Sequence, residues 1–319
     1  MNVGSRGAIS HFIVPRARDS LLLLSLLSLL AAILLPPITR NRPVHHYQLT
    51  FDISQSMNVQ DVAVGGKTAS RLELAKAATE LLLQKLPCGS RIGWSVFTGQ
   101  RTLPLITPME ICENYSGLRL SLDMINGKMR WFNGSSVGKG LHQSLRIADA
   151  IGDDVALIMF SDGHEAPPLR PGQTGLPKSE GLGLSGMLVG VGGDTPVQIP
   201  KSDAQGRNIG YWLPHEVSQS PGENGQQSHE ELSRLKSEHM IQLAQLSGLE
   251  YVQIHSPAEL NQTLINANLA KQAPSPVDYR WVPATLALLF LFLRYISFGR
   301  FWPRQKHHSQ PVISSTGQS

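Results

Sequence analysis

The stretch Tyr47–Ser56 reads YQLTFDISQS, and the interpretation of the whole chain starts from it. Its first part, Tyr47–Asp52, is a short run rich in apolar residues that ends on a carboxylate, which is typical of a buried strand. One carboxylate and two hydroxyls then follow at alternate positions, on Asp52, Ser54 and Ser56. The backbone turns where a strand ends, so we expect these three side chains to converge. Their hard oxygen atoms suit Mg²⁺, Mn²⁺ or Ca²⁺ rather than a soft metal.

Strands and helices alternate along the chain after this run. We predict helices over Arg71–Leu86, Ser116–Ile125, Val137–Ile151, His229–Leu246 and Pro257–Asn268, and strands over Tyr47–Asp52, Arg91–Thr98, Arg101–Ile106, Val155–Phe160, Ser185–Val191 and Glu250–Ile254. Residues 167–182 and 194–230 are rich in Pro, Gly, Ser and Gln, which predicts long loops. The alternation predicts a doubly wound α/β fold, with a mostly parallel sheet and helices on both faces.

Two further polar loops fall at the same predicted edge of the sheet. Phe160-Ser161-Asp162-Gly163 ends another strand, and ligands of such folds bind beyond the carboxyl ends of strands. The small-residue loop Asn133–Gly138 opens a helix and presents Ser135 at the helix N-terminus. Asp-x-Ser-x-Ser alone is a weak motif, because such triplets often form turns or helix caps. Together the three loops predict a cation site, partly bridged by water, that is formed by Asp52, Ser54, Ser56, Ser135 and Asp162.

These three loops resemble the metal-ion-dependent adhesion site of von Willebrand factor A (VWA) domains. Further matches to bacterial VWA proteins with flanking membrane helices are Arg71-Leu72 with Ala75-Lys76, Gly93–Gly99, Val189–Gly192 and Gln242–Leu260. The resemblance covers about residues 47–270 and implies a Rossmann-like VWA fold. The family usually has Thr in the middle loop, whereas this chain has Ser135, with Ser136 as a substitute. A Ser hydroxyl still binds a hard cation, but it is less constrained than the β-branched Thr.

The resemblance implies a non-enzymatic, metal-dependent protein-binding module. It would hold one divalent cation, Mg²⁺ before Ca²⁺ or Mn²⁺, and an acidic residue of a periplasmic or membrane protein would complete the coordination shell. Related bacterial proteins are commonly linked to MoxR-type AAA+ ATPases. The segments Leu86–Ser90, Asp162–Leu169 and Ile199–Asp203 are most similar to accessory VWA proteins of methanol oxidation clusters. That subgroup is implicated in supplying Ca²⁺ to methanol dehydrogenase, so the implied partners are this enzyme or other accessory proteins.

Two apolar segments flank the predicted domain. The uncharged run 20–38, at ~1.5 Å per helical residue, comes close to spanning a ~30 Å hydrocarbon core. The second run, 281–298, has aromatic residues at its ends and contains Arg294. A cleaved signal peptide is the alternative for the first run, and a buried core helix for the second. We predict an inner-membrane protein of five parts: a cytoplasmic tail 1–19, a transmembrane helix 20–38, a periplasmic VWA domain 39–280 with its core at about 47–270, a transmembrane helix 281–298, and a cytoplasmic tail 299–319.

The formal net charge of +4 comes from the two ends of the chain. Residues 1–38 carry a net +2 and residues 281–319 a net +4, which leaves −2 for residues 39–280. A nucleic-acid-binding domain would need a basic face, so we expect no nucleic-acid partner. The positive ends instead fit the cytoplasmic sides of membrane segments.

The motifs of the common enzyme classes are missing from the sequence. We find no Cys–His pairing, no Gly-x-Ser-x-Gly elbow with a matched His, and no phosphate-binding loop with its lysine. We therefore expect no enzyme. Two alternatives remain: a general envelope or stress VWA protein working with a MoxR-type ATPase, and a metal-dependent hydrolase in which His164 or Glu165 is the general base.

Several residues near the metal loops are candidates for a partner-binding rim. Trp131 precedes the middle loop, and His164 with Glu165 directly follows the third. A solvated loop is the alternative interpretation for the latter pair. The candidate rim residues are Trp131, Ser136, His164 and Glu165.

The chain has two cysteines, Cys88 and Cys112. An even number of cysteines in a periplasmic domain permits a disulfide. Two buried free thiols are the alternative, and the sequence leaves both open.

Overall fold

The computed structural model describes residues 10–295 except 153, 171, 178–183, 204, 221–227 and 268. The predicted tail 299–319 and the first nine residues of the tail 1–19 lie outside the described residues. The chain divides into two compact units. One is Thr39–Pro276, and the other combines Met1–Ile38 with Val277–Ser319. We describe each unit by itself.

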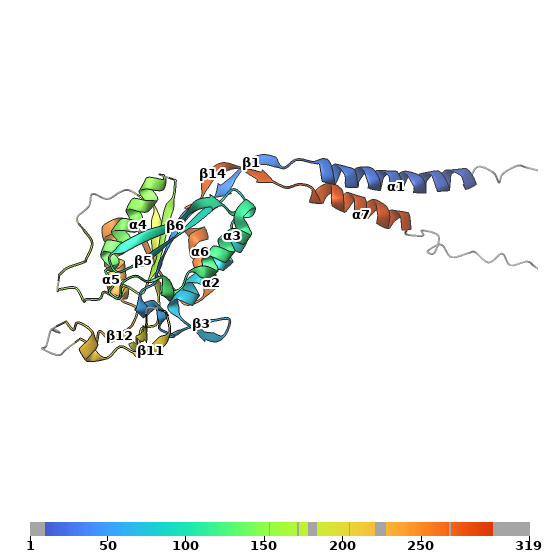
Figure 1. The fold of residues 1–319 in the computed structure, drawn as a ribbon. Coiled ribbons are helices and arrows are strands. Elements are labelled where there is room, and N and C mark those ends of the chain that lie inside the picture. Colours follow the sequence, from blue (N-terminus) through green and yellow to red (C-terminus); the bar gives the residue numbers. More distant parts are fainter. Residues whose placement is uncertain are drawn as a thin grey trace, which may run out of the picture. The chain divides into compact units, whose positions relative to one another are not determined.

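A six-stranded sheet forms the middle of the larger unit (Figure 1). Neighbouring strands β13 to β8, β8 to β7, β7 to β2 and β2 to β5 run parallel, and β6 pairs antiparallel with β5 at the edge. The strands in spatial order are β13 (Glu250–Ile254), β8 (Gly186–Val191), β7 (Ala156–Ser161), β2 (His46–Asp52), β5 (Arg91–Thr98) and β6 (Arg101–Glu110). The prediction of a mostly parallel α/β sheet is confirmed.

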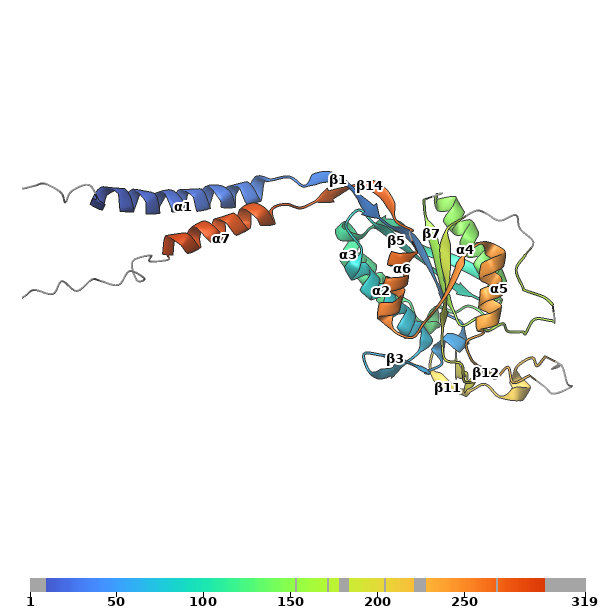
Figure 2. The same cartoon turned by 180° about the vertical axis from the view of Figure 1, so that it is seen from behind.

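Helices cover both faces of this sheet (Figure 2). One face packs against α2 (Arg71–Lys85), α3 (Ile111–Met124) and α6 (Pro257–Asn266). The other packs against α4 (Val137–Ile151) and α5 (Ser237–Ser247). Alternation along β2 divides its side chains between the two faces, as expected for a strand.

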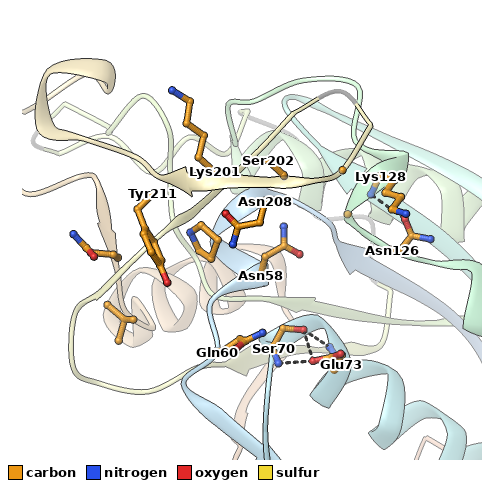
Figure 3. A pocket seen from close by; sticks show the side chains of 15 residues that line it. Asn58, Gln60, Ser70, Glu73, Asn126, Lys128, Lys201, Ser202, Asn208 and Tyr211 are labelled. Atoms are coloured by element: carbon orange, nitrogen blue, oxygen red, sulfur yellow. Dashed lines mark hydrogen bonds between the residues drawn. The ribbon is translucent and has the colours of Figure 1, made fainter.

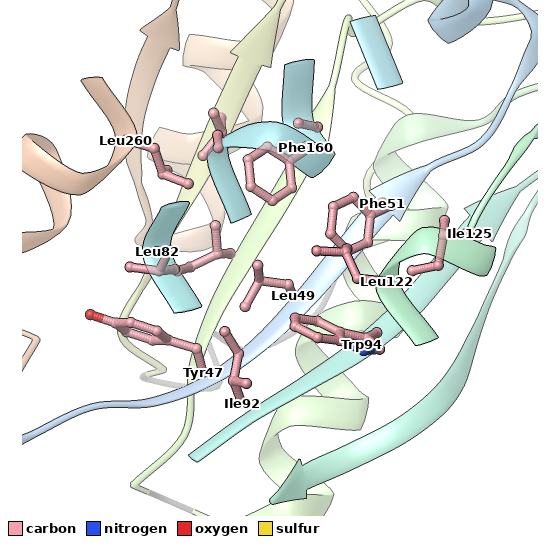
Figure 4. Packing of buried hydrophobic residues seen from close by; sticks show 14 of the residues in the cluster. Tyr47, Leu49, Phe51, Leu82, Ile92, Trp94, Leu122, Ile125, Phe160 and Leu260 are labelled. Carbon is pink, nitrogen blue, oxygen red and sulfur yellow. The ribbon is translucent and has the colours of Figure 1, made fainter. Parts of the chain in front are cut away.

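The first of the two cores is built around aromatic side chains (Figure 4). Phe51 of β2 stacks on Phe160 of β7 with ring centroids 5.2 Å apart, and it meets the edge of Trp94 of β5 at 6.3 Å. All three rings are fully buried. Burying a side chain of this size contributes roughly 1.5–3 kcal/mol, so these contacts hold the middle strands in place.

Helix α2 shows how the local sequence sets an element's ends. Ser70 caps its N-terminus, because the Ser70 side chain accepts from the Glu73 N–H and the Glu73 carboxylate accepts from the Ser70 N–H at 2.6 Å. Pro87 follows two residues after Lys85 and cannot continue the helix. The capping box contributes about 1 kcal/mol. Next to it, β3 (Val62–Val64) and β4 (Lys67–Ala69) form a small hairpin.

Cys88 and Cys112 form a disulfide, with Cα atoms 5.3 Å apart. It joins the turn after α2 to the first turn of α3. The alternative of two free thiols does not apply to this structure.

The segment 194–230 is more structured than the sequence predicts. It contains β9 (Val197–Gln198), a hairpin of β10 (Pro200–Ser202) and β11 (Asn208–Tyr211), and the short 3₁₀-helix η3 (Pro214–Glu216). The prediction of a helix over His229–Leu246 is wrong at its start. Residues Leu232–Ser233 form β12, which pairs with β9, so that α5 begins only at Ser237. The insert, as we call residues 194–230, lies beside the site described below.

The smaller unit consists of α1 (Ser10–Leu34) and α7 (Trp281–Tyr295), which contact each other. The Ser25 hydroxyl of α1 donates to the Ala287 carbonyl of α7 at 3.1 Å. Ala287 is the one buried residue among the described side chains of α7, so the buried-core-helix alternative is wrong. Strands β1 (Ile38–Val44) and β14 (Lys271–Val277) form a separate two-stranded sheet at the two ends of the sequence of the larger unit.

Within the described residues, no helix combines the length and the apolar character needed to cross a membrane. The predicted transmembrane helices over 20–38 and 281–298 are therefore not confirmed. Helix α1 ends at Leu34. Helix α7 has 15 residues in the described part of the chain.

Candidate metal centre

The three predicted loops meet at the carboxyl ends of β2 and β7, which are neighbours in the sheet. The chain runs from β2 to β5 on one side, whereas β7 lies on the other, so the strand order reverses here. Ligand sites of open α/β sheets form at such switch points because the loops diverge and leave a crevice. The middle loop joins them through two hydrogen bonds of 2.8 Å, from the Ser135 N–H to the Ala166 carbonyl and from the Ala166 N–H to the Ser135 carbonyl.

Asp52 is the last residue of β2 and is fully buried. Its Oδ1 accepts from the Ser54 N–H at 2.9 Å, and its Oδ2 accepts from the Ser161 hydroxyl at 2.7 Å. Burial first, and the nearby Asp162 second, raise the pKa of Asp52 to about 7. Among the described residues no Lys, Arg or His forms an ion pair with it. This buried carboxylate thus lacks a compensating positive charge.

Asp162, which directly follows β7, is also fully buried but is compensated. Its Oδ2 accepts from Arg71 Nη1 at 2.5 Å and from the Ser233 hydroxyl at 3.0 Å, and its Oδ1 accepts from the His164 N–H at 3.0 Å. Burial opposes ionisation, but the charge of Arg71 and the other donors hold the pKa of Asp162 below its usual value. Because Arg71 already compensates its charge, Asp162 suits an indirect, water-bridged role better than direct ligation.

Arg71 matches the family pattern in the sequence, but our sequence reasoning gave it no role at the site. It is completely buried at the first position of α2, and it bridges two acids. Its Nε donates to Asp61 Oδ1 at 3.0 Å and its Nη2 to Asp61 Oδ2 at 2.6 Å, while Nη1 reaches Asp162. A cation at a helix N-terminus opposes the helix dipole. That conflict was the one signal in the sequence that could have pointed to a buried acidic partner.

The predicted serine ligands are buried beside Asp52. Ser54 and Ser56 are each 3% exposed, and their hydroxyl oxygens are 3.1 Å apart. Ser135 is 4% exposed, and its hydroxyl has no hydrogen-bond partner within the described part of the chain. A buried hydroxyl without a partner costs about 1–3 kcal/mol, which calls for a ligand. Hard oxygen donors around one uncompensated carboxylate fit a divalent cation such as Mg²⁺.

A cavity of about 210 Å³ opens onto these hydroxyls. Gln55, the residue between Ser54 and Ser56, ties the cavity's parts together. Its Oε1 accepts from Trp212 Nε1 at 3.0 Å and from the Ser202 N–H at 3.2 Å, and its Nε2 donates to Asn133 Oδ1 at 3.0 Å. The first metal loop, the middle loop and the insert are thereby held by one side chain.

The four predicted rim residues have different surroundings. His164 is 3% exposed and lines the cavity, and burial lowers its pKa. Glu165 is 8% exposed and accepts instead from the Gly138 N–H of α4 at 3.2 Å and pairs with His239 at 3.1 Å. The solvated-loop alternative for this pair is therefore wrong. Ser136 is half-buried at the start of α4, and Trp131 is 43% exposed outside the cavity lining.

A second, larger cavity of about 500 Å³ lies near the β10–β11 hairpin (Figure 3). Its lining is dominated by amide and hydroxyl side chains, including Asn58, Asn126, Asn208 and Tyr211. The hairpin lines the larger cavity through Ser202, whereas the residues that flank it, Ile199 and Trp212, line the smaller one. None of the five predicted metal ligands lines the larger cavity.

No family model matches the chain. Curated relatives include the UPF0353 protein of Mycolicibacterium paratuberculosis strain ATCC BAA-968 / K-10, which is 27% identical over 143 residues, covering 42% of this chain and 38% of that protein. A UPF0353 protein of Mycobacterium avium is 28% identical over 144 residues, with coverages of 42% and 38%. The chain thus spans less than half of the length of these relatives.

Solved structures with some likeness to the chain include two from Bacteroides. An aerotolerance-related membrane protein of Bacteroides fragilis is 20% identical, covers 70% of this chain and 98% of its own, and has a TM-score of 0.48. The hypothetical protein BatB of Bacteroides thetaiotaomicron has the same identity and coverages with a TM-score of 0.49. A von Willebrand factor type A protein of Catenulispora acidiphila is 12% identical, with coverages of 76% and 43% and a TM-score of 0.41.

Proposed function

We propose that the larger unit is a VWA-type module that binds one divalent cation, Mg²⁺ in the first place, and through it an acidic group of a protein partner. The observation that carries this proposal is the pairing of a buried, partnerless hydroxyl on Ser135 with a buried, uncompensated carboxylate on Asp52. Both cost free energy in the metal-free protein, and one hard cation would satisfy both.

The chain's residues divide into ligands and supports. Asp52, Ser54, Ser56 and Ser135 would hold the cation, directly or through water. Asp162 would orient water, while Arg71 and Ser233 hold its carboxylate in place. Because Asp52 would be the one carboxylate among these direct ligands, net positive charge would remain on the cation. The bound cation would supply an open coordination position that attracts a partner's carboxylate.

We propose that the module is not an enzyme. Of the two general bases considered for a hydrolase, Glu165 is engaged by the first turn of α4 and by His239. His164 remains in the cavity, but its Nε2 faces Glu230 at 4.0 Å. The rest of the lining consists of hydroxyl, amide and apolar side chains and of Glu216, which pairs with Lys201.

We propose, further, that the smaller unit holds the protein at the bacterial inner membrane, with the larger unit in the periplasm. Many leucine side chains of α1 are exposed, such as Leu26 at 62% and Leu34 at 70%. Exposed apolar surface on this scale marks a membrane or protein contact. The basic ends of the chain favour cytoplasmic termini.

The partner is proposed from the sequence segments alone. Leu86–Ser90, Asp162–Leu169 and Ile199–Asp203 favour methanol dehydrogenase or another accessory protein of methanol oxidation, with maturation or Ca²⁺ insertion as the task. A MoxR-type ATPase in a general envelope function is the alternative partner. Co-purification from cells that express each partner, with and without chelator, separates the two.

Calorimetric titration of the full chain with Mg²⁺ tests the metal centre. Wild type should bind one ion, Asp52→Ala should lose binding, and Ser135→Ala should bind at least about tenfold more weakly. Ser116→Ala is the matched control, since Ser116 is exposed on α3, away from the metal loops. If wild type binds none of Mg²⁺, Mn²⁺ and Ca²⁺, or if Ser135→Ala and Ser116→Ala behave alike, the proposal fails.

A further inference from the structure

The cavity at the candidate metal centre is lined by two chemically different sets of residues. The polar set includes the three serines of the metal loops together with Gln55, Asn133, His164, Glu216, Ser218 and Glu230. The apolar set, which we call the apolar wall, comes partly from the chain after the third metal loop and partly from the insert: Ala166, Pro167, Pro168, Ile199, Trp212 and Val217. A cation-binding loop alone needs no such wall. Its presence points to selectivity for what accompanies the metal-bound group.

The size of the cavity limits what can enter. Ligand pockets for small molecules measure roughly 300–1,000 Å³. This cavity holds about 210 Å³, which is below that range. The volume therefore favours one or two side chains on a narrow projection over a larger ligand.

Trp212, the largest side chain of the apolar wall, is held in place by several contacts. Trp212 is held by its hydrogen bond to Gln55 and by the Lys201 ammonium, which lies 4.7 Å from the centre of its ring. The backbone N–H of Trp212 also donates to the Ile199 carbonyl at 3.1 Å. The wall is therefore attached to the metal loop, and a ligand meets both at once.

The acidic residues at the cavity define its charge preference. Glu216 pairs with Lys201 at 2.5 Å, which neutralises it. Glu230 Oε2 lies 4.0 Å from His164 Nε2, well beyond the separation in the Glu216–Lys201 pair, so this carboxylate is not neutralised in the same way. A ligand with several negative charges would be repelled by Glu230. A ligand with one carboxylate can place it at the metal and keep apolar groups near the wall.

We infer that this cavity selects a single carboxylate flanked by an apolar side chain, presented on a loop tip or a chain end of the partner. This inference rests on the proposed cation-binding function and specifies its ligand. The insert is the specificity element, because it supplies Ile199, Trp212 and Val217.

Short peptides test the inference with the full chain in the presence of saturating Mg²⁺. Four acetylated, amidated pentapeptides are compared by calorimetry, with the central sequences Leu-Glu-Leu, Gly-Glu-Gly, Glu-Glu-Glu and Leu-Gln-Leu. We expect Leu-Glu-Leu to bind at least about tenfold more tightly than Gly-Glu-Gly. We expect Glu-Glu-Glu to gain nothing over Gly-Glu-Gly, and Leu-Gln-Leu not to bind.

Variants of the wall locate the selectivity. Trp212→Ala should reduce the preference for Leu-Glu-Leu over Gly-Glu-Gly to within about threefold. Leu120→Ala, which changes an exposed apolar residue of α3 outside the cavity lining, should leave this preference unchanged. Val217→Ser, on the half-exposed part of the insert, provides the same test if Trp212→Ala does not fold. Equal binding of Leu-Glu-Leu and Gly-Glu-Gly, or tightest binding of Glu-Glu-Glu, overturns the inference. If the protein binds Mg²⁺ but none of the four peptides, the inference is overturned and the proposed metal centre stands. If the protein does not bind Mg²⁺, the proposed function itself is refuted.

Discussion

Replacing Asp52 by Asn should stabilise the metal-free protein at pH 8 while it abolishes cation binding. Asp52 is fully buried, has a pKa raised to about 7, and has no compensating cation among the described residues. Asn has nearly the same shape. Its oxygen can accept from the Ser54 N–H, and its NH₂ can donate to the Ser161 hydroxyl, so the local hydrogen bonds survive in altered form.

The magnitude follows from the shift in pKa. The carboxyl goes from a reference value of 3.8 to about 7, roughly three units, and each unit corresponds to 1.36 kcal/mol, or about 4 kcal/mol in total. Because the pKa is raised in the folded state, the associated stability is fully present below pH 3.8 and is lost as the pH rises through 7. Water entry on ionisation reduces the penalty, so we expect Asp52→Asn to gain about 2–4 kcal/mol at pH 8.

Urea unfolding with chelator measures this gain. Tryptophan fluorescence reports the transition, since Trp94 is fully buried in the core. The stability difference between Asp52→Asn and wild type should shrink below about 1 kcal/mol at pH 4, where Asp52 is protonated in the folded protein and partly protonated in the unfolded chain. Added Mg²⁺ should stabilise wild type and leave the variant unchanged. A loss of stability at pH 8 in chelator would refute the reasoning, because it would mean that the charge of Asp52 is already compensated in the metal-free protein.

Three further predictions follow from the same structure. The Mg²⁺ dissociation constant should be about tenfold larger at pH 6 than at pH 8, because protons compete for Asp52 at a pKa of about 7; calorimetry at several pH values checks this, and a flat profile contradicts it. Arg71→Met should cost about 3–5 kcal/mol in urea unfolding, because two buried acids lose their partner, and a loss below about 1 kcal/mol would mean that the network relaxes. Gly140→Ala should lower the unfolding free energy by about 1–3 kcal/mol, since the new Cβ would lie 2.2 Å from the ring of Phe97. The control Gly117→Ala, in open space on α3, should raise the unfolding free energy by about 0.5–1 kcal/mol. Equal effects of the two substitutions in urea unfolding would disprove the packing argument.

The regular elements were predictable wherever local pattern and burial agree. Val137–Ile151 is a helix with the predicted ends, and Arg91–Thr98 is a strand with the predicted ends. An apolar stripe at helical spacing and a short run rich in β-branched and aromatic residues are local signals that tertiary contacts reinforce. The start of α5 was mispredicted because β12 is only a two-residue strand, and its pairing with β9 is a long-range contact that periodicity does not reveal.

The candidate site was predictable in its residue types but not in its charges. Asp52 and Asp162 look equivalent in the sequence, since each follows an apolar strand. The structure separates them, because Arg71 neutralises Asp162 and nothing described neutralises Asp52. The pairing joins positions 91 residues apart, and only the packing of α2 against the sheet brings the guanidinium there.

The sequence by itself determined that polar loops with hard oxygen ligands follow the strands of an α/β sheet, because alternation and strand-end chemistry are local properties of the chain. Only the tertiary structure decided which carboxylate remains available to a cation, since burial and ion pairing depend on residues distant in sequence. It also decided that the insert forms an apolar wall over the site. Gln55 occupies a position of the Asp52-x-Ser54-x-Ser56 motif that the motif leaves unspecified. Its side chain accepts a hydrogen bond from Trp212 of that wall, which lies 157 positions away in the chain.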